Sequence, residues 1–464
     1  MAKEVPLDRQ EARRTMMLTT PISRLVPKMA IPTIVSMLVT SLYNMADTYF
    51  VSMLPGDAAT GAVGINMSLM AIIQMFGMAI ATGANSYISR LLGAKRDDEA
   101  NRTLSTTFFT AFGIGLFVMI AGLTFLDPLM SMLGAKDPEV LRYSRDYASF
   151  ILYAAPFMAA QFLLSQCLRA EGSAMFSMIG ITVGAAINVV LDPIFIFTFG
   201  MEVKGAAAAT AISQVISFCV LLYPYFKRHS LLRISIKSIK FSKAIITEVA
   251  KMGFPTMLRN GLMSLATIVT NNVAQGFSVE ALAAISVVNR IMMFVTSAIL
   301  GYGQGFQPVA GFNYGAKRYD RVMHAFKFAS FTGVSAISVL ALVVGIFAPQ
   351  IMAQFSTSQI TRDIGVFSIR LQCIVMPIHA WCIVVNMMYA ALGRAVGAAL
   401  LSLSRQGLFF IPTVAIMSLL LHEYGLASAQ AVADTLSLTL AIPYAVIAIR
   451  SMKKLQREMV EAKV

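Results

Sequence analysis

Two acidic residues and an amide interrupt otherwise apolar stretches of this sequence, where they could bind a cation or a proton. Asp47 falls in one such stretch, and Asn188 and Asp192 fall in another. A separation of four positions places Asn188 and Asp192 one turn apart on one face of a helix. Pro193 follows directly, and because it has no backbone N–H it frees a carbonyl oxygen one turn earlier, near Val189. Carboxylate, amide and carbonyl oxygens are the ligands of a hard cation such as Na⁺.

The same residues also suit a proton carrier, because two neighbouring buried carboxylates raise each other's affinity for a proton. Charge at bilayer depth is costly and is usually functional, which favours a working site. Asp47 and Asp192 lie far apart in the sequence. The alternative is that each carboxylate makes a local hydrogen bond near a helix end.

The elements that must position these residues follow from the composition. Of the 464 residues, 57% are hydrophobic and only 13% are charged, whereas soluble domains have roughly a quarter charged residues. The apolar residues form repeated long runs, and about 20 such residues span a bilayer as a helix. The sequence therefore predicts an all-α polytopic membrane protein and excludes a soluble enzyme, a nucleic-acid-binding protein and a fibrous protein.

Twelve apolar runs separated by charged, Gly or Pro breaks predict twelve transmembrane helices. Several runs are longer than a bilayer requires, which indicates tilt or extension beyond it. The expected spans are 26–53, 60–91, 104–126, 140–168, 175–200, 205–226, 245–275, 281–311, 324–348, 363–392, 397–420 and 425–449.

The formal net charge of +14 is distributed as a topology signal. Lys and Arg crowd the N-terminal tail, a central loop at 227–244 and the C-terminal tail, and they alternate with poorly basic loops. This positive-inside pattern predicts a multi-pass protein of the inner (plasma) membrane with both termini in the cytoplasm, and it needs no nucleic-acid partner. The segment 1–21 is polar and charged, so we expect no cleavable signal peptide.

An internal repeat divides the chain into two halves. The string KMAIP at 28–32 recurs as KMGFP at 251–255, and GAKR at 93–96 recurs at 315–318. Pro128 and Pro349, Pro156 and Pro377, and Gly172 and Gly393 share one common offset, close to that of the two strings. We expect two pseudo-symmetric six-helix bundles, at 1–226 and 245–464, joined by a cytoplasmic basic linker at 227–244. Duplicated halves in the same orientation are typical of transporters that alternate between two states.

The second half lacks the acidic cluster, because Asp192 aligns near Ile411 and Asn188 near Gly407. Its intramembrane polar residues are different. Arg405 and Asp434 could form a buried ion pair, while Arg259 and Arg290 are expected to extend from helix ends toward the interface. The candidate residues of a substrate cavity are Tyr43, Gln304, Gln307, His379 and Arg405.

Several motifs together resemble the multidrug and toxic compound extrusion (MATE) family. The resemblance spans all twelve predicted helices and favours the DinF-like prokaryotic branch, because helices seven and eight have no obvious carboxylates. The motifs are DT at 47–48, SRLLG at 89–93, LRAEGS at 168–173, NVVLDPIF at 188–195, GQGFQP at 303–308, NYGA at 313–316 and SRQ at 404–406.

The resemblance implies two facing bundles that open alternately to the cytoplasm and the outside. It implies export of cationic or amphipathic organic compounds, including drugs, in exchange for Na⁺ or H⁺. The matching coupling residues are Asp47, Asn188, Asp192 and Thr210. From this cluster we hypothesise that a bound cation or proton neutralises Asp47 and Asp192 and lets the first helix bend. Arg169 and Glu171 match a helix-end motif whose expected role is structural.

Other functions remain open at this point. A lipid-linked oligosaccharide flippase or a narrow metabolite exporter would share the duplicated architecture. The sequence has no GxxxxGK[ST] string, so we expect no ATP hydrolysis. The four cysteines form no CxxC or Cys/His spacing, and no nucleophile–base constellation appears, so we expect no cofactor, no structural metal and no enzymatic activity.

Overall fold

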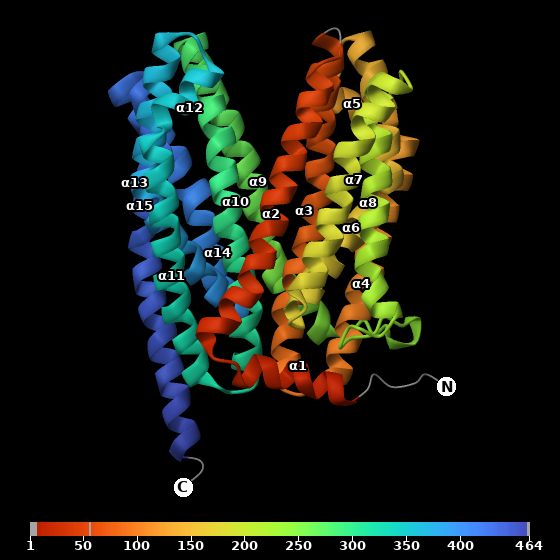
Figure 1. The fold of residues 1–464 in the computed structure, drawn as a ribbon, viewed down its shortest axis with the longest axis vertical. Helices are drawn as coiled ribbons and strands as arrows, with labels where there is room; N and C mark the ends of the chain where they lie inside the picture. Colours follow the sequence, from red (N-terminus) through yellow and green to blue (C-terminus); the bar gives the residue numbers. More distant parts are fainter. Residues whose placement is uncertain (1–6, 55–56, 462–464) are drawn as a thin grey trace. The chain divides into compact units, whose positions relative to one another are not determined.

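The computed structural model describes residues 7–54 and 57–461, and this part of the chain is helical without a strand. The protein is an all-α polytopic membrane protein (Figure 1). In chain order the helices of the first half are α1 (Leu7–Thr19), α2 (Ile22–Ser52), α3 (Asp57–Gly93), α4 (Asp97–Thr124), α5 (Leu126–Met132), α6 (Pro138–Ala170), α7 (Ala174–Pro193), the π-helical turn η1 (Ile194–Thr198) and α8 (Glu202–Phe226). After the short η2 (Ile236–Ser238) come α9 (Lys243–Phe277), α10 (Val279–Gly315), α11 (Tyr319–Ile346), α12 (Ala348–Phe355), α13 (Gln359–Ala391), α14 (Ala395–Leu403), the π-helical turn η3 (Ser404–Leu408) and α15 (Phe410–Glu461).

Each predicted span corresponds to a helical segment of the described chain. Ten helices there are long and apolar enough to cross a membrane. One of them, Ala395–Glu461, holds the last two predicted spans, because His422 has φ 51° and ψ −127° and breaks the helix between them. The further span, 245–275, corresponds to α9, which is 35 residues long.

The chain forms two compact units. Unit 1 contains the described residues up to Met17 together with Val35–Gly253, and unit 2 contains Leu18–Ile34 with the described residues from Phe254 onward. The division therefore falls inside α2 and inside α9, close to Pro32 and Pro255, which are equivalent in the repeat. The first turns of each repeat's first helix belong to the other repeat's unit, whereas the sequence-based division at 226 and 245 assigns them to their own half.

Two equivalent glycines explain this arrangement within each unit. A Cβ on Gly83 of α3 would lie 2.2 Å from the carbonyl oxygen of Val249, at the start of α9. A Cβ on Gly305 of α10 would lie 2.4 Å from the Cα atom of Ala30, near the start of α2. Gly83 and Gly305 are related by the same offset as the two GAKR strings, so the repeat preserves the same close backbone contact in both units.

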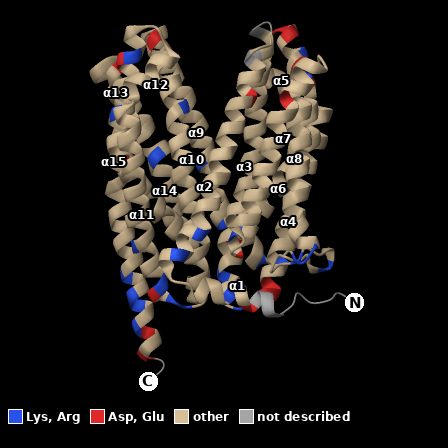
Figure 2. Ribbon diagram, in the orientation of Figure 1, with Lys and Arg blue, Asp and Glu red and all other residues tan. Residues whose placement is uncertain are grey.

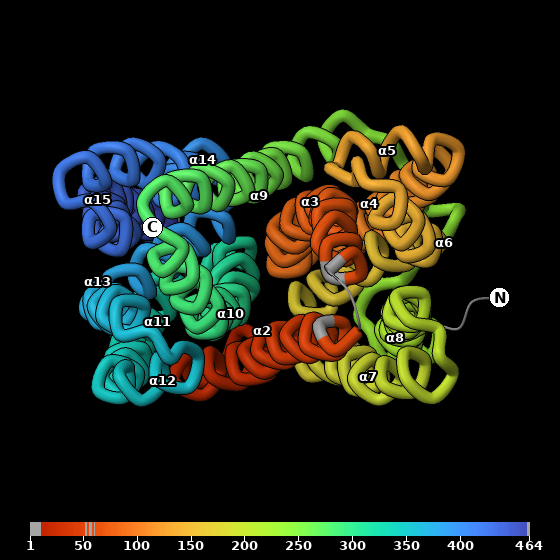
Figure 3. Tube along the Cα trace, turned by 90° about the horizontal axis from the view of Figure 1, so that it is seen from above, coloured from red at the N-terminus to blue at the C-terminus, as the bar shows by residue number. Residues whose placement is uncertain are grey.

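One helix is central to each unit. In unit 1, α6 packs against α3, α4 and α8, and most of its side chains beyond Ser144 are buried. In unit 2, the repeat-equivalent α13 packs against α10, α11 and α15. Figure 3 views both units along their helices and shows α7 and α8 side by side in unit 1. These central helices fix the positions of the others, including the helices that carry the polar residues.

Glu171, at the end of α6, ties three segments of unit 1 together. Its fully buried carboxylate accepts hydrogen bonds from the Ser230 hydroxyl at 2.6 Å and the Leu231 amide at 2.8 Å. The guanidinium of Arg13 on α1 is 3.3 Å away and also donates to the His229 carbonyl. These contacts agree with the structural role that the family resemblance implies for Glu171. Burial raises the pKa of Glu171, while Arg13 and the Ser230 and Leu231 donors oppose that rise.

Charged side chains gather at the ends of each unit. Figure 2 shows Lys and Arg concentrated near α1 in unit 1 and along the last turns of α15 in unit 2. In this view, most of the helical ribbon between the ends is tan and so has no Lys, Arg, Asp or Glu. This is the distribution of a multi-pass membrane protein.

The contact between α4 and α6 gives a first prediction. A Cβ on Gly115 would lie 2.5 Å from the Cα atom of Pro156, so Gly115→Ala forces two helix backbones apart. We expect it to lower the free energy of unfolding by about 1–3 kcal/mol, measured as a drop in Tm of the purified protein. Gly113→Ala is the matched control, because Gly113 faces open space and Ala favours a helix. Equal melting temperatures for the two variants would contradict this account.

A second prediction concerns the pH dependence of stability. Because the pKa of Glu171 is raised in the folded state, the folded protein binds this proton more tightly than the unfolded chain. The free energy of unfolding then decreases as pH rises from the ordinary carboxyl pKa through the raised folded value. Glu171→Gln removes this titration, so the Tm of the variant relative to wild type should increase over that pH range. Glu139→Gln, at an exposed position on α6, should show no such trend. A Tm difference for Glu171→Gln that is constant with pH would contradict the linkage.

Candidate functional site

Asn188, Asp192 and Thr210 form a buried polar cluster between α7 and α8. The side-chain amide of Asn188 donates to the Asp192 carboxylate and to the Thr210 hydroxyl, both at 3.3 Å. Asn188 and Asp192 are fully buried, and Thr210 is 2% exposed. The predicted one-turn spacing of Asn188 and Asp192 therefore produces a contact, and Thr210, which only the family resemblance suggested, joins it.

Local sequence explains how α7 and α8 approach each other at the cluster. Pro193 ends the regular part of α7, and the chain continues as the π-helical turn η1. Gly205 then lets α8 pack closely on η1, since a Cβ there would lie 2.7 Å from the Phe195 carbonyl carbon. Further along the two helices, the Ser217 hydroxyl donates to the Gly180 carbonyl at 2.8 Å. These small residues bring Thr210 within reach of Asn188.

Asp47, on the part of α2 that belongs to unit 1, completes the cluster. Its side chain is 7% exposed and lies close enough to Asp192 for the two charges to interact. Tyr43, one turn earlier on α2, accepts a hydrogen bond from the Gln214 amide of α8 at 3.4 Å and also lies near both carboxylates. The structure thus brings Tyr43 and Asp47 to Asp192, from which the sequence separates them widely.

Three oxygen atoms of this cluster have no hydrogen-bond partner. They are Oδ1 of Asp47, Oδ2 of Asp192 and Oδ1 of Asn188, and all are buried. Buried polar atoms are normally paired, so unpaired acceptors in one place indicate a site that binds a donor or a cation. The set contains two carboxylates, an amide oxygen and a hydroxyl, which suits either Na⁺ coordinated by oxygens or a proton held by a carboxylate.

Tyr147 of α6 also belongs to the cluster and was missed by the sequence analysis. It is 1% exposed, and its hydroxyl lies beside that of Thr210, near Asp47 and Asp192. A tyrosine in an apolar run has no distinctive spacing to the other residues. Its only signal is a phenol hydroxyl at bilayer depth, which needs a polar neighbour.

Unit 2 contains a different polar cluster, centred on Arg405 and Asp434. The Arg405 side chain donates from Nε to Oδ1 of Asp434 at 2.6 Å and from Nη2 to Oδ2 at 3.3 Å. Gln430 donates to the same carboxylate at 2.9 Å. The predicted ion pair is therefore confirmed, and its fork geometry is the strong bidentate form.

His379 and Arg259 lie in the electrostatic neighbourhood of this pair. His379 is 2% exposed, both its ring nitrogens lack a hydrogen-bond partner, and it interacts with Arg405 and Asp434. Arg259 interacts with Arg405, so two guanidinium groups accompany one carboxylate. The expectation that Arg259 extends from a helix end was wrong. It lies well inside α9, beyond Pro255, in the part of the helix that belongs to unit 2.

The remaining substrate-cavity candidates lie on α10. Gln304 is 7% exposed and Gln307 is 2% exposed, and the Gln307 amide nitrogen lacks a partner. Gly305, between them, is the residue that contacts α2 within unit 2. Of the five candidates, Tyr43 therefore joins the carboxylate cluster of unit 1, and His379 joins Arg405 in unit 2. Gln304 and Gln307 lie near the packing contact of α10 with α2.

Comparison with known proteins identifies the family. The MatE family model matches residues 32–194 and 255–416, one match in each half of the repeat. The chain belongs to the MatE family. It is a membrane transporter and not an enzyme, and the resemblance inferred from the motifs is confirmed. Its placement in the DinF-like branch stays a prediction.

Related proteins of known name align with this chain over most of its length. Multidrug export protein MepA of Staphylococcus aureus (strain N315) is 28% identical over 418 residues, which is 90% of this chain and 92% of the relative. The protein of that name from Staphylococcus haemolyticus (strain JCSC1435) is 27% identical over 413 residues, which is 89% of this chain and 91% of the relative.

Solved structures of MATE transporters share the fold. An outward-facing multidrug resistance MATE transporter of the MOP superfamily has a TM-score of 0.90 at 25% identity, over 95% of this chain and 98% of that chain. A MATE transporter in complex with MaL6 has a TM-score of 0.89 at 25% identity, over 95% and 99%.

The ion pair in unit 2 gives a third prediction. Arg405→Gln and Asp434→Asn should each destabilise this MatE family protein, because each leaves an unpaired charge in a partly buried place. The double variant should recover part of the loss, with a coupling energy of about 2 kcal/mol in a double-mutant cycle of unfolding. The exposed pair Arg145–Asp127, at 2.8 Å, is the matched control and should couple by less than about 1 kcal/mol. Equal coupling energies for the two pairs would contradict the structural role.

Proposed function

We propose that this protein exports cationic and amphipathic organic compounds in exchange for Na⁺ or H⁺ by alternating access. One observation carries the proposal: Asp47 and Asp192 are buried near one another, and each has an oxygen without a partner. Two such carboxylates in a membrane bundle are stable only when a cation or proton compensates their charge. An ion gradient acting on this cluster can then drive transport.

In the proposed mechanism, the coupling cation and the substrate favour different states of the transporter. Binding of Na⁺ or H⁺ neutralises Asp47 and Asp192 and lets α2, which carries Asp47 and contains Pro27 and Pro32, bend. The bent helix no longer offers the same cavity to the substrate, so the substrate leaves on the outer side. Exchange follows because each ligand shifts the population toward the state that it binds better.

Drug-like substrates are supported by the relatives, which are named multidrug export proteins. Cations are the finer proposal for this chain, because Tyr43 places an aromatic ring beside the two carboxylates. The lipid bilayer is the other expected partner. The basic residues near α1 and along the end of α15 support a plasma-membrane protein with both termini in the cytoplasm (Figure 2).

The second candidate function is a narrow metabolite exporter, or a lipid-linked oligosaccharide flippase, with the same architecture. One observation favours it: Arg259 and Arg405 accompany a single carboxylate, Asp434, next to the unpaired His379. This cluster has an excess of positive charge, which suits an anionic or zwitterionic cargo. The net positive cluster of unit 2 and the net negative cluster of unit 1 thus support different cargo.

The fourth prediction tests the coupling site. Purified wild-type protein is placed in liposomes loaded with a fluorescent organic cation. It should release the cation under the gradient that drives export, which is either a Na⁺ gradient or a pH gradient. Asp192→Asn should lose gradient-driven release by at least about tenfold, because the amide no longer supplies a negative charge for the coupling ion. The rate of fluorescence change under each gradient is the measurement.

Asp146→Asn is the matched control for this experiment. Asp146 precedes Tyr147 on α6, but its carboxylate is 29% exposed and pairs with Lys204 at 3.4 Å, so its variant should transport normally. The melting temperature of each variant checks folding. Normal gradient-driven export by Asp192→Asn would exclude the mechanism. If neither gradient moved any of a panel of cations in wild type, the second candidate function would be favoured.

A further inference from the structure

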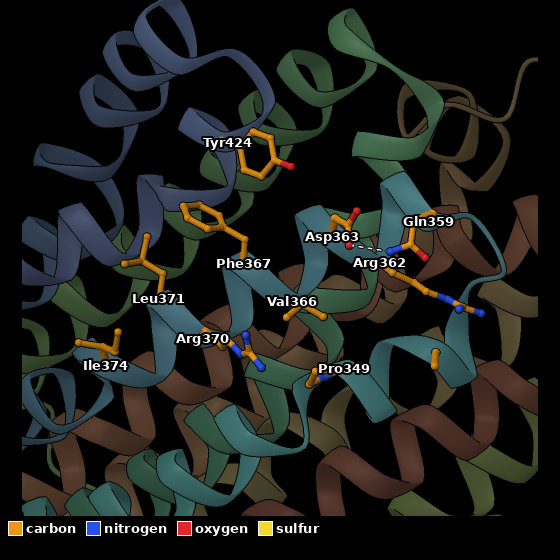
Figure 4. A pocket seen from close by; sticks show the side chains of 11 residues that line it. Pro349, Gln359, Arg362, Asp363, Val366, Phe367, Arg370, Leu371, Ile374 and Tyr424 are labelled. Carbon is orange, nitrogen blue, oxygen red and sulfur yellow. Dashed lines mark hydrogen bonds between the residues drawn. The ribbon is translucent and has the colours of Figure 1, made fainter.

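Unit 2 has a cavity of about 730 Å³ at the end where α13 begins. It is lined by α13 together with α12 and the part of α15 that follows the break at His422 (Figure 4). This end of unit 2 is opposite to the last turns of α15 (Figure 1). The cavity is separate from the Arg405–Asp434 cluster, and its lining includes two arginines, Arg362 and Arg370.

Both arginines are held in position and still have free donors. Nε of Arg362 donates to the Ser356 carbonyl at 2.6 Å, and Nε of Arg370 donates to the Gly345 carbonyl at 3.4 Å. Within the described residues neither makes an ion pair. The neighbouring Asp363 accepts a hydrogen bond from the Gln359 amide at 2.9 Å. The Nη groups of both arginines therefore have no protein acceptor among the described residues, and a guanidinium in this condition binds an oxyanion.

The other side of the cavity is apolar and faces outward. In Figure 4, Phe367, Leu371, Ile374 and Tyr424 lie to one side of α13, and the two arginines extend to the other. Phe367 and Tyr424 pack edge to face, with ring centroids 5.2 Å apart. Ile374 is 73% exposed and Tyr424 is 46% exposed, so this surface is open to the surroundings of the helix. The cavity thus combines an oxyanion-binding side with a hydrocarbon-binding side.

The position along α13 matches the edge of the bilayer. A helix of 33 residues is roughly 50 Å long, whereas the hydrocarbon core is about 30 Å thick, so α13 extends into the headgroup layer. Arg362 lies in the first turn of α13, and Arg370 lies about 12 Å further along, from where its long side chain can extend back toward the headgroup layer. Phospholipid phosphates occupy this depth, and acyl chains begin just below it.

The repeat indicates that the two arginines are not needed for the fold. At the offset that relates Pro156 to Pro377, Arg362 corresponds to Leu141 and Arg370 corresponds to Ser149. The same helix in unit 1 therefore forms with uncharged residues at these two positions, although it has Arg142 and Arg145 at neighbouring ones. Arginines at these two positions are a feature of unit 2 alone.

We propose that this cavity binds an anionic phospholipid, with the phosphate on Arg362 and Arg370 and an acyl chain along Phe367, Leu371, Ile374 and Tyr424. The charges lining the cavity are two arginines and one aspartate, so the cavity has an excess of positive charge. A zwitterionic headgroup gains less here, because the net positive charge of the lining disfavours its ammonium group. The occupant is thus distinct from the exported substrate and binds from the bilayer.

The fifth prediction tests lipid binding with the full-length protein in detergent. Phosphatidylglycerol, phosphatidylcholine and inorganic phosphate are titrated separately, and bound lipid is counted by native mass spectrometry while Tm is followed. Wild type should bind phosphatidylglycerol at least about tenfold more tightly than phosphatidylcholine. Arg362→Gln/Arg370→Gln should lose this preference, because the oxyanion loses both guanidinium groups. Arg362→Lys/Arg370→Lys should keep part of it, because lysine binds phosphate as a point charge.

Arg142→Gln/Arg145→Gln, on the equivalent end of α6, is the matched control and should retain the wild-type preference. Phosphatidylcholine binding by the glutamine variant verifies that its fold is intact. An undiminished preference in Arg362→Gln/Arg370→Gln, or no preference in wild type, would overturn the proposal. Stabilisation by inorganic phosphate equal to that by phosphatidylglycerol would also overturn it, because the occupant would then be a free oxyanion and not a lipid.

Discussion

The cost of placing a carboxylate inside a membrane bundle determines how the polar residues of this protein are arranged. An ionised Asp at the bilayer centre costs about 2.5–3.5 kcal/mol on insertion scales unless something compensates its charge. In unit 2 the compensation is internal, since both oxygens of Asp434 accept hydrogen bonds from Arg405. In unit 1, Asp192 receives one neutral amide donor, from Asn188. The same residue type is thus paired with Arg405 in one unit, and in the other it keeps a carboxylate oxygen without a hydrogen-bond partner, which the proposed coupling cation would compensate.

The repeat gives both units the same helical scaffold, although their buried carboxylates are paired differently. Both units have a buried central helix, α6 or α13, and in both an equivalent glycine, Gly83 or Gly305, contacts the first helix of the other repeat. The acidic cluster is not repeated, because Asp192 aligns near Ile411 and Asn188 near Gly407. Packing surfaces are therefore maintained in duplicate while the intramembrane charges have diverged. In the proposed mechanism, this divergence lets unit 1 respond to an ion while unit 2 keeps its ion pair.

The sequence predicts the fold well because the bilayer imposes a simple rule. An apolar run must be a helix, since no water satisfies its backbone groups, so each predicted span corresponds to a helical segment. It also predicts the Asn188–Asp192 contact, which depends only on helical spacing. It misses Tyr147 and wrongly places Arg259, because their neighbours come from helices distant in the sequence. The sequence analysis also misses the hydrogen-bond donors around Glu171, because Arg13 and Ser230 come from separate segments of the chain.

The charge of the unit 1 cluster limits how coupling could proceed. When both are ionised, Asp47 and Asp192 carry two negative charges, and a single Na⁺ leaves one of them uncompensated. Two protons, or one proton with one Na⁺, remove the charge completely. A monovalent organic cation likewise leaves one negative charge uncompensated, so it is electrostatically equivalent to one Na⁺. In the proposed exchange, the oxygens of Asn188 and Thr210 favour the small cation, because a small cation can contact them together with the carboxylates. Competition between the two needs no direct overlap of their atoms, because each is attracted by the same uncompensated charge.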